Sequence, residues 1–328
     1  MRVCVYGAGA IGGMIGFLLK RQGVDVTLIA RRDHYKEIKN NGLTFISKEY
    51  DIEETKKFAI FENLDNLGFF DLVINSLKAH SANQTAEIFS KILKDDTTVL
   101  PTLNGIPWWF FYKFGGKFNN YQLQSVDPNQ NLWKNVGPSK VLGCVVYPAA
   151  TISKPGVIKH IEGKRLIIGE PDNIKSDRAK AVSSLMIKAG IKSPISRDIR
   201  SDIWLKLLGN SSFNPLSIIT QNTLKEICEN KNSKNIIKSM MQEVISIGNK
   251  LNIKIKHTIE QRIEGAKNVG EHKTSTLQDF ENARPLELSA LIKSLIEVGS
   301  LTETQTPTIT AIYRLAKIFA EKKGCPIG

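Results

Sequence analysis

The stretch Arg2-Val3-Cys4-Val5-Tyr6-Gly7-Ala8-Gly9-Ala10-Ile11-Gly12 decides the fold of the first half of this chain. Its first five residues favour a β-strand, and apolar residues at helical spacing follow it. Glycines in the order G-x-G-x-x-G therefore stand between a strand and a helix. They permit a tight turn, a close approach of the backbone to a pyrophosphate, and close packing of helix on strand. The helix N-terminus attracts the phosphate charge. We therefore predict a dinucleotide-binding turn whose contact residues are Gly7, Ala8, Gly9, Ala10, Ile11 and Gly12.

The second predicted strand, residues 24–29, indicates which dinucleotide is bound. NAD enzymes usually carry Asp or Glu at the end of this strand, where the carboxylate bonds the ribose 2′-hydroxyl. Here the strand ends in Ala30-Arg31-Arg32. A guanidinium binds a 2′-phosphate through charge-assisted bonds, whereas a carboxylate would repel it. The sequence predicts NADP(H) with Arg31 as the contact; the alternative, two solvated arginines, stays open.

Two further strands end in polar residues. Residues 71–77 form a near-continuous apolar run, typical of a buried parallel strand, and Lys78 follows it. Residues 97–103 form the next predicted strand, which ends in Asn104-Gly105. Ligands of open α/β sheets lie beyond the carboxyl ends of the strands. Lys78 is therefore placed to meet a phosphate or ribose, and Asn104 to join a site; a surface lysine and an ordinary turn are the structural alternatives.

The remaining first-half segments are read from their apolar patterns. The aromatic run Pro107-Trp108-Trp109-Phe110-Phe111-Tyr112 either covers a site or packs against another domain. An antiparallel pair is expected from residues 157–161 and 165–169, and a linker from residues 191–199. Further strands are expected at residues 43–47, 58–61 and 141–147, and helices at residues 79–93 and 176–189.

After Asp198 the strand signals fade and helical spacing dominates. Helices are expected at residues 236–251, 258–268, 290–298 and 308–321. The predicted fold class is α/β: an N-terminal Rossmann-type dinucleotide-binding domain, residues 1–195, followed by an all-α C-terminal domain, residues 196–328.

A polar stripe opens the second domain within Asp202-Ile203-Trp204-Leu205-Lys206-Leu207-Leu208-Gly209-Asn210-Ser211-Ser212-Phe213-Asn214-Pro215. Lys206, Asn210 and Asn214 are four residues apart, so a helix places them one above the other on one face. Burying an unpartnered amide costs on the order of 1–3 kcal/mol. The stripe either bonds neighbouring backbone as a structural network or faces a cleft that receives a ligand with polar oxygens.

Two other polar residues are singled out in the second half. Ser275 lies in Lys273-Thr274-Ser275-Thr276, where it is either a helix N-cap or a site residue. Glu287 stands between two leucines at the start of a predicted helix, where it either interacts with the helix N-terminus or serves a site.

Composition limits the class of protein. The chain has 328 residues, a hydrophobic fraction of 41% and a net charge of +13. Its lysines are spread along the chain without a run of five or six basic residues, so we expect no nucleic-acid partner. No segment reaches the roughly 20 apolar residues of a membrane helix, and we expect no membrane association. The glycines that follow Arg2 also interrupt the run that superficially resembles a signal peptide.

Cysteine usage indicates the compartment. Cys4, Cys144, Cys228 and Cys325 are far apart and form no C-x-x-C pair. This spacing argues against a metal site or a disulfide framework and favours a reducing, cytoplasmic location. A homodimer is compatible with the sequence, which does not fix the oligomeric state.

Together these motifs resemble the ketopantoate reductase family, also called 2-dehydropantoate 2-reductase. The resemblance runs along nearly the whole chain, and it is specific because the motifs come in the family's order and at similar separations. They are Gly7 to Gly12, Leu77-Lys78-Ala79, Asn104-Gly105, Pro155-Gly156-Val157, Lys206 with Asn210 and Asn214-Pro215, Thr274 to Asp279, and Glu287.

The resemblance implies a Rossmann domain and a helical domain with the site between them, NADPH as cofactor, and a small keto acid as substrate. It implies that Lys206 is the catalytic acid and that Asn210, Asn214 and Ser275 hold the substrate. Asn104 would then lie at the nicotinamide and substrate, and Glu287 would contact the cofactor. Arg31 and Lys78 would lie on the cofactor's phosphate side. The implied reaction is reduction of ketopantoate to pantoate, in pantothenate and coenzyme A biosynthesis.

This chain departs from the family's pattern in three places. It has Leu286-Glu287-Leu288-Ser289 where the family usually has Thr-Glu-Ile-Asp, Phe213 just before Asn214, and the Pro107-Trp108-Trp109 loop of a subgroup. The keto acid therefore stays open. The alternatives are a dehydrogenase for a different 2-keto or 3-hydroxy acid, and a non-catalytic NADP(H) sensor.

Overall fold

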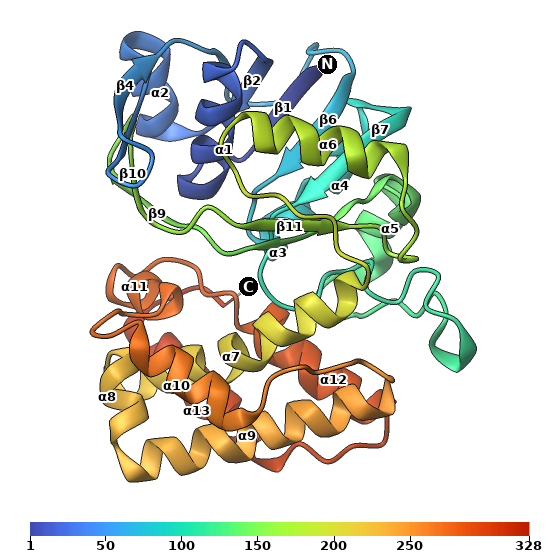
Figure 1. Ribbon diagram of the computed structural model, residues 1–328, viewed down its shortest axis with the longest axis vertical. Helices are drawn as coiled ribbons and strands as arrows, with labels where there is room; N and C mark the ends of the chain where they lie inside the picture. Colours follow the sequence, from blue (N-terminus) through green and yellow to red (C-terminus); the bar gives the residue numbers. More distant parts are fainter. Residues whose placement is uncertain (328) are drawn as a thin grey trace. The chain divides into compact units, whose positions relative to one another are not determined.

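The computed structural model describes residues 1–327, and the chain forms two compact units (Figure 1). The first comprises Met1–Leu103, Trp109–Gln122 and Asn129–Ile199. The second comprises Asn104–Trp108, Leu123–Pro128 and Arg200–Gly328. Two short segments from the first half of the sequence thus pack with the helices of the second half.

A five-stranded parallel sheet forms the centre of the first unit, with the strand order β5-β2-β1-β6-β7. The central strand β1 is buried from Val3 to Tyr6, and its Val5 lies opposite Leu28 on one side and Ile74 on the other. This arrangement confirms the predicted Rossmann-type fold. The strands are β1 (Arg2–Tyr6), β2 (Asp25–Ile29), β5 (Ala59–Phe61), β6 (Phe70–Asn75) and β7 (Leu93–Pro101).

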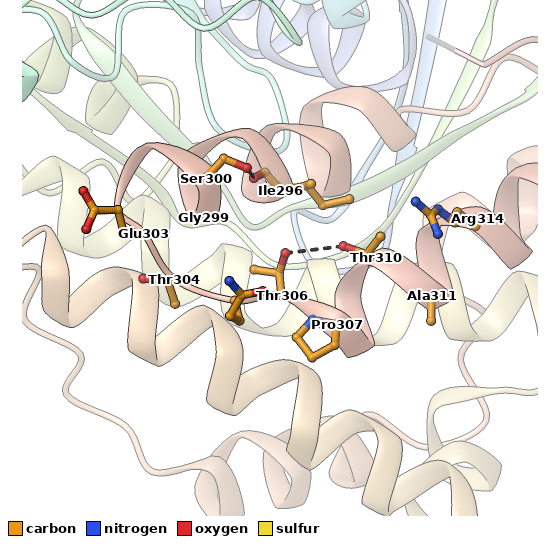
Figure 2. Close-up of a pocket in the computed structure, with 11 residues that line it drawn as sticks. Ile296, Gly299, Ser300, Glu303, Thr304, Thr306, Pro307, Thr310, Ala311 and Arg314 are labelled. Atoms are coloured by element: carbon orange, nitrogen blue, oxygen red, sulfur yellow. Dashed lines mark hydrogen bonds between the residues drawn. The ribbon is translucent and has the colours of Figure 1, made fainter.

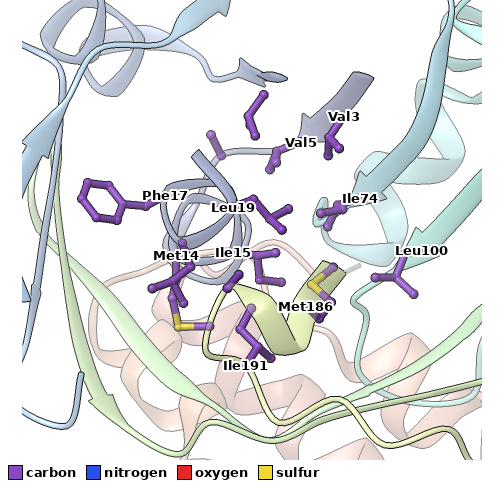
Figure 3. Packing of buried hydrophobic residues seen from close by; sticks show 14 of the residues in the cluster. Val3, Val5, Met14, Ile15, Phe17, Leu19, Ile74, Leu100, Met186 and Ile191 are labelled. Carbon is purple, nitrogen blue, oxygen red and sulfur yellow. The ribbon is translucent and has the colours of Figure 1, made fainter. Parts of the chain in front are cut away.

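Helix α1 (Ala10–Arg21) packs on the parallel sheet with one side and on a second, four-stranded sheet with the other. The second sheet has the order β4-β3-β10-β9. Every residue of α1 from Gly12 to Leu19 is buried, and Figure 3 shows Met14, Ile15, Phe17 and Leu19 in the core. Burial on all sides explains why this helix is apolar throughout and why it resembles a signal peptide in sequence.

The other elements of the first unit surround this core. The strands of the second sheet are β3 (Leu43–Ser47), β4 (Ile52–Lys56), β9 (Ala149–Lys154) and β10 (Val157–Glu162), and β8 (Gly143–Val146) pairs with β11 (Leu166–Gly169). The helices are α2 (Arg32–Asn41), α3 (Ala79–Gln84), α4 (Ala86–Ser90), α5 (Asn131–Asn135) and α6 (Asp177–Lys188). Three short 3₁₀ helices are η1 (Gly116–Phe118), η2 (Pro128–Gln130) and η3 (Pro138–Lys140).

Two local predictions were wrong. Residues 157–161 and 165–169 do not pair with each other, because β10 pairs with β9 and β3 whereas β11 pairs with β8. The helix expected over residues 79–93 is two short helices that break at Thr85, and the chain is already strand at Leu93. The Thr85 hydroxyl donates to the Ser81 carbonyl, and its backbone leaves the helical region.

The aromatic run packs within the first unit from Trp109 onward. Trp109, Phe110 and Phe111 are buried, and the Phe111 ring contacts the rings of Phe114 and Phe118. These residues thus pack within their own unit, which is neither of the two alternatives drawn from the sequence.

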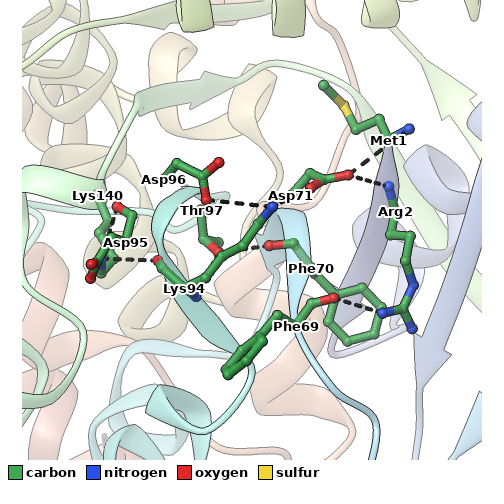
Figure 4. Close-up of polar contacts among 10 residues, drawn as sticks. All are labelled: Met1, Arg2, Phe69, Phe70, Asp71, Lys94, Asp95, Asp96, Thr97 and Lys140. Carbon is green, nitrogen blue, oxygen red and sulfur yellow. Dashed lines mark hydrogen bonds and ion pairs between the residues drawn. The ribbon is translucent and has the colours of Figure 1, made fainter.

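Polar contacts tie the amino ends of β1, β6 and β7 together (Figure 4). The Asp71 carboxylate accepts from the Arg2 amide at 2.7 Å and pairs with Lys94 Nζ at 2.8 Å. The bond from Lys94, followed by the bond from the Arg2 amide, lowers the pKa of Asp71. Polar contacts thus stabilise the edge of the sheet at which the strands begin. The turns described below lie at the opposite edge, where the strands end.

The second unit is helical, as predicted. Its elements are α7 (Ile199–Thr220), α8 (Leu224–Glu229), α9 (Lys231–Lys250), α10 (Ile259–Asn268), α11 (Ser275–Glu281), a π-helix η4 (Ser289–Lys293), α12 (Ser294–Leu301) and α13 (Pro307–Lys323). Within residues 1–327, no helix combines the length and apolarity needed to cross a bilayer.

The packing of α1 predicts unequal effects of two glycine substitutions on stability. A Cβ at Gly12 would lie 2.3 Å from the Gly7 carbonyl oxygen, whereas a Cβ at Gly9 would meet nothing within 4 Å. We expect Gly12→Ala to destabilise the protein by about 1–3 kcal/mol, because backbone must move to relieve the clash. Gly9→Ala should leave stability nearly unchanged. Urea unfolding of both variants tests this, and equal stabilities would contradict the packing described.

Candidate active site

The glycine-rich turn joins β1 to α1 and is held on the neighbouring strand. Gly7 has φ +97°, which an L-residue with a side chain rarely adopts. The amides of Gly7 and Ala8 both donate to the Ile29 carbonyl, at 3.2 and 2.7 Å. The turn is therefore fixed to the end of β2, and the amides of the first turn of α1 lack intrahelical acceptors.

The turn has the shape that a dinucleotide requires. Gly9 is the N-cap of α1, makes no side-chain cap, and has open space where a Cβ would stand. Phosphate oxygens can approach the backbone there, next to a 12-residue helix whose N-terminus carries partial positive charge. The residues present therefore fit a pyrophosphate.

Two basic residues end the strands on either side of β1. Arg31 is exposed and follows β2, and Lys78 is half-buried and follows β6 as the N-cap of α3. Because β2, β1 and β6 are neighbours and parallel, Arg31, the glycine turn and Lys78 follow the same edge of the sheet. Burial raises the pKa of the Tyr6 hydroxyl, while its contacts with Thr85 and Arg31 oppose that rise. The Arg31 side chain thus reaches back toward the end of β1.

A second group of predicted residues meets in the helical unit. Lys206 Nζ donates to Asn104 Oδ1 at 2.7 Å, and Asn104 Nδ2 lies 3.4 Å from Glu287 Oε2. An ammonium, an amide and a carboxylate thus form a chain from residues far apart in the sequence. The contacts orient the amide, with its oxygen toward the cation and its nitrogen toward the anion.

The backbone around Gly105 brings Asn104 to this position. Gly105 has φ +87°, and a Cβ there would lie 2.1 Å from the Ala290 carbonyl oxygen. The same carbonyl accepts from the Ile106 amide at 3.0 Å and from the Ser294 hydroxyl at 2.6 Å. Ala290 belongs to the π-helix that follows Glu287, and π-helical turns are frequent at functional sites.

The polar stripe on α7 serves two purposes along its length. Asn214 is buried, and its Nδ2 donates to Thr276 Oγ1 at 2.9 Å, which ties α7 to α11. Asn210 is half-buried, and its side chain has no hydrogen-bond partner among the described residues. Phe213, between the two amides, is buried. The structure thus gives Asn214 a bond within a structural network, whereas it shows no such bond for Asn210 among the described residues.

Ser275 is not the N-cap that the sequence suggested. Thr274 caps α11, since its hydroxyl accepts from the Leu277 amide at 3.1 Å. Thr274 Oγ1 also lies 2.7 Å from Ser217 Oγ on α7. Ser275 is the exposed first residue of the helix.

Sequence reasoning also missed Thr274, Thr276 and His34 as residues that fix the predicted site. His34 bonds the Ala8 carbonyl from α2. A Thr preceding an apolar run is a capping signal that could have found Thr274. No local signal pointed to Thr276 or His34, because their partners are distant in the chain.

A pocket on the helical unit lies apart from these residues. The pocket in Figure 2 has a volume of ≈ 680 Å³ and lies where α12 meets α13. Its lining includes the hydroxyl residues Ser300, Thr304, Thr306 and Thr310, with the exposed Arg314 at one end. None of the predicted site residues lines it.

The chain matches known proteins along nearly its whole length. The family model described as Ketopantoate reductase PanE/ApbA matches residues 3–173, and the model of its C-terminal part matches residues 198–320. A 2-dehydropantoate 2-reductase of Mesorhizobium japonicum is 40% identical over 99% of both chains.

Solved structures agree with these matches. The crystal structure of a candidate ketopantoate reductase from Ralstonia solanacearum superposes with a TM-score of 0.93, at 32% identity over 98% of both chains. D-mandelate dehydrogenase with NADH and anilino(oxo)acetate has a TM-score of 0.84 at 21% identity, covering 98% of this chain and 99% of that one. The latter likeness concerns the fold.

Adjacent residues on α11 supply a test of the stripe's structural part. Thr276→Val keeps the side-chain shape but removes the partner of the buried Asn214 amide. We expect it to lower the free energy of unfolding by about 1–3 kcal/mol. Ser275→Ala, at the exposed neighbouring position, should change it by less than about 0.5 kcal/mol. Denaturant titration measures both, and a Ser275 effect as large as that of Thr276 would refute the assignment.

Proposed function

The chain belongs to the ketopantoate reductase family of oxidoreductases, and we propose that it reduces 2-dehydropantoate to pantoate with NADPH and with Lys206 as the proton donor. The observation that carries this proposal is the chain Lys206–Asn104–Glu287. It supports a reaction in which a cation meets an oxygen that gains negative charge. The product would serve pantothenate and coenzyme A biosynthesis.

The dinucleotide would be held by the glycine turn, Gly7 to Gly12, with Arg31 at the 2′-phosphate, Lys78 on the phosphate side and Glu287 as a further contact. NADPH, when bound, supplies the hydride that the carbonyl carbon of the substrate receives. The open space at Gly9 and the guanidinium after β2 support this assignment.

Lys206 has two tasks in the reduction. As the carbonyl carbon accepts hydride, negative charge develops on the carbonyl oxygen, and a nearby ammonium stabilises it. The ammonium then transfers a proton to that oxygen, which completes the hydroxyl group and leaves a neutral amine. The Asn104 oxygen holds the Lys206 side chain in one orientation before the substrate arrives, which reduces the entropy lost at the reaction step.

The substrate would be oriented by polar side chains of α7 and α11. We assign the carboxylate and hydroxyl of the keto acid to Asn210, Asn214 and Ser275, with Asn104 beside the carbonyl. The amide of Asn210, which lacks a partner among the described residues, supports its role. Asn214 already donates to Thr276, so it would contribute its remaining hydrogen-bonding capacity.

The domain limits predicted from sequence, 1–195 and 196–328, remain part of this proposal, as does a cytoplasmic location. The sheet-bearing part would bind the cofactor, and the helical part would supply the proton and bind the substrate.

Replacing Lys206 tests the catalytic assignment. Lys206→Ala should bind NADPH like the wild type but reduce ketopantoate about 10² to 10⁴ times more slowly, because the proton donor is lost. NADPH binding is followed by fluorescence titration and turnover by absorbance. Lys250→Ala, at an exposed position at the end of α9, is the matched control. Turnover by Lys206→Ala within a few-fold of wild type would remove Lys206 from the mechanism.

Replacing Arg31 tests the choice of cofactor. A charge-assisted bond to the 2′-phosphate contributes about 1.5–3 kcal/mol, so Arg31→Ala should raise the KM for NADPH about tenfold or more. The KM for NADH should change less than twofold, since NADH lacks that phosphate. Arg32→Ala is the neighbouring control. Equal effects on both cofactors would show that Arg31 does not select NADPH.

A panel of keto acids separates ketopantoate from other substrates. Initial rates with ketopantoate, smaller aliphatic 2-keto acids and an aromatic 2-keto acid give relative kcat/KM values. Preference for ketopantoate supports the assignment made here. Preference for another acid would indicate a dehydrogenase whose substrate specificity differs, with the region around the buried Phe213 as the place to look for the cause. NADPH binding without turnover of any acid would favour a sensor.

A further inference from the structure

One side chain of the first unit joins three segments around the glycine turn. His34, in the first turns of α2, is half-buried. Its Nε2 lies 3.0 Å from the Ala8 carbonyl oxygen, and its Nδ1 accepts from the Gly156 amide at 3.0 Å. A backbone N–H only donates and a carbonyl only accepts, so the contacts assign the tautomer: the ring is neutral, with its proton on Nε2. Burial lowers the pKa of His34, in keeping with a neutral ring.

The bond to Ala8 has a directional consequence. The Ala8 carbonyl and the Gly9 N–H belong to one planar trans peptide, so they point in opposite directions. The structure contains no cis peptide bond within the described residues. When His34 holds the carbonyl on its own side, the Gly9 N–H must point away from His34. Gly9 is also the residue beside which the turn leaves open space.

The amide group of Ala8 is fixed as well as its carbonyl group. The Ala8 amide donates to the Ile29 carbonyl at 2.7 Å, so both polar groups of Ala8 are bonded. Rotation of the Ala8–Gly9 peptide would break the His34 bond without a replacement that the described contacts offer. His34 is thus the side chain that prevents this rotation.

The bond to Gly156 anchors His34 itself. Gly156 has φ +75°, and a Cβ there would lie 2.5 Å from Glu37 Cγ, so this turn packs directly on α2. Its carbonyl accepts from the Thr44 amide at 2.8 Å, which joins the turn to β3. One nitrogen of the ring is therefore bonded to a turn of the second sheet, and the other nitrogen is bonded to the glycine turn.

The segment before His34 also carries strain. Arg32 has φ +56°, which is uncommon for a residue with a long side chain and costs on the order of 1–3 kcal/mol. This backbone conformation lies between Arg31 and His34, so the arginine assigned to the 2′-phosphate and the imidazole on the glycine turn leave the same short segment.

We propose that His34 is a positioning residue for the dinucleotide: its Nε2–H fixes the Ala8 carbonyl and thereby aims the Gly9 amide at the cofactor's pyrophosphate. The inference rests on the proposed cofactor binding by the glycine turn. His34 does not touch the reacting atoms in this role. It acts on cofactor affinity through the orientation of one peptide group.

Two conservative substitutions separate the two bonds of the ring. The amide nitrogen of Gln reaches as far as Nε2, whereas the amide oxygen of Asn reaches only as far as Nδ1. His34→Gln therefore keeps a donor for Ala8 and loses the acceptor for Gly156. His34→Asn keeps the acceptor for Gly156 and loses the donor for Ala8. Each variant loses one neutral hydrogen bond, so each should fold with a similar, modestly lowered Tm.

The expected result is an unequal effect on binding. The Kd for NADPH, measured by fluorescence titration, should rise at least about fivefold in His34→Asn, the equivalent of about one neutral hydrogen bond. It should stay within twofold of wild type in His34→Gln. At saturating NADPH, kcat should stay within twofold of wild type in both variants. The Tm of each variant, measured without cofactor, reports the structural contribution separately.

Two results with the variants would overturn the inference. One is a wild-type Kd in a folded His34→Asn protein. The other is an equal loss of affinity in both variants, which would indicate a general structural role for the ring. Absence of NADPH and NADH binding by the wild-type protein would overturn the cofactor assignment itself, and this inference with it. Wild-type binding with unchanged variants would overturn the role of His34 and leave the proposed function standing.

Discussion

The first unit depends on one close approach: the backbone of α1 against the backbone of the turn that precedes it. At Gly12 a single methyl group would meet the Gly7 carbonyl oxygen at 2.3 Å, and also Val5 and Ser76 side-chain atoms at 2.9 Å. The helix can start directly over the strand only because this position lacks a Cβ. The helix also lies close to both sheets at two further glycines. A Cβ at Gly13 would lie 2.2 Å from Ile158 of the second sheet, and a Cβ at Gly16 would lie 2.9 Å from Leu28 of the parallel sheet. The position of the amides that we propose to bind the phosphates follows from this packing.

Much of the fold could be predicted because its signals are local. The strand, turn and helix from Arg2 onward, the buried strand β6 and the long helix α7 were all evident from periodicity and glycine spacing. Strand pairing was less accessible. The 157–161 segment pairs in parallel with β3, more than a hundred residues earlier, and no short-range pattern records such a partner. The hairpin predicted there chose the wrong neighbour in sequence, because β10 pairs with the preceding strand β9 and not with the following strand β11.

The candidate site shows the same division between local and distant information. Ser275, with Gln278 three residues later, has the better capping pattern, yet Thr274 is the cap. The Ser217 hydroxyl on α7 contacts Thr274, and the local capping pattern holds no information about this contact between helices. Similarly, Lys206 and Asn104 were recognised singly from sequence, while their hydrogen bond follows from Gly105 packing on the π-helix. Residue types were predictable; the partners that orient them were not.

Both halves of the chain use one device to prepare a polar group for a ligand. In the first unit an imidazole fixes a carbonyl, and peptide planarity transmits this constraint to the next amide. In the second unit a carboxylate and an ammonium fix the two ends of the Asn104 amide, whose plane then cannot turn over without losing both contacts. In each case the orientation is set before binding by a neighbour of matching polarity. Hydrogen bonds made in advance reduce the ordering that binding would otherwise require, and this preorganisation is where such a site gains its affinity and rate. A residue that orients a binding group can therefore matter as much for function as a residue that touches the ligand. The sequence around such a residue does not reveal this role.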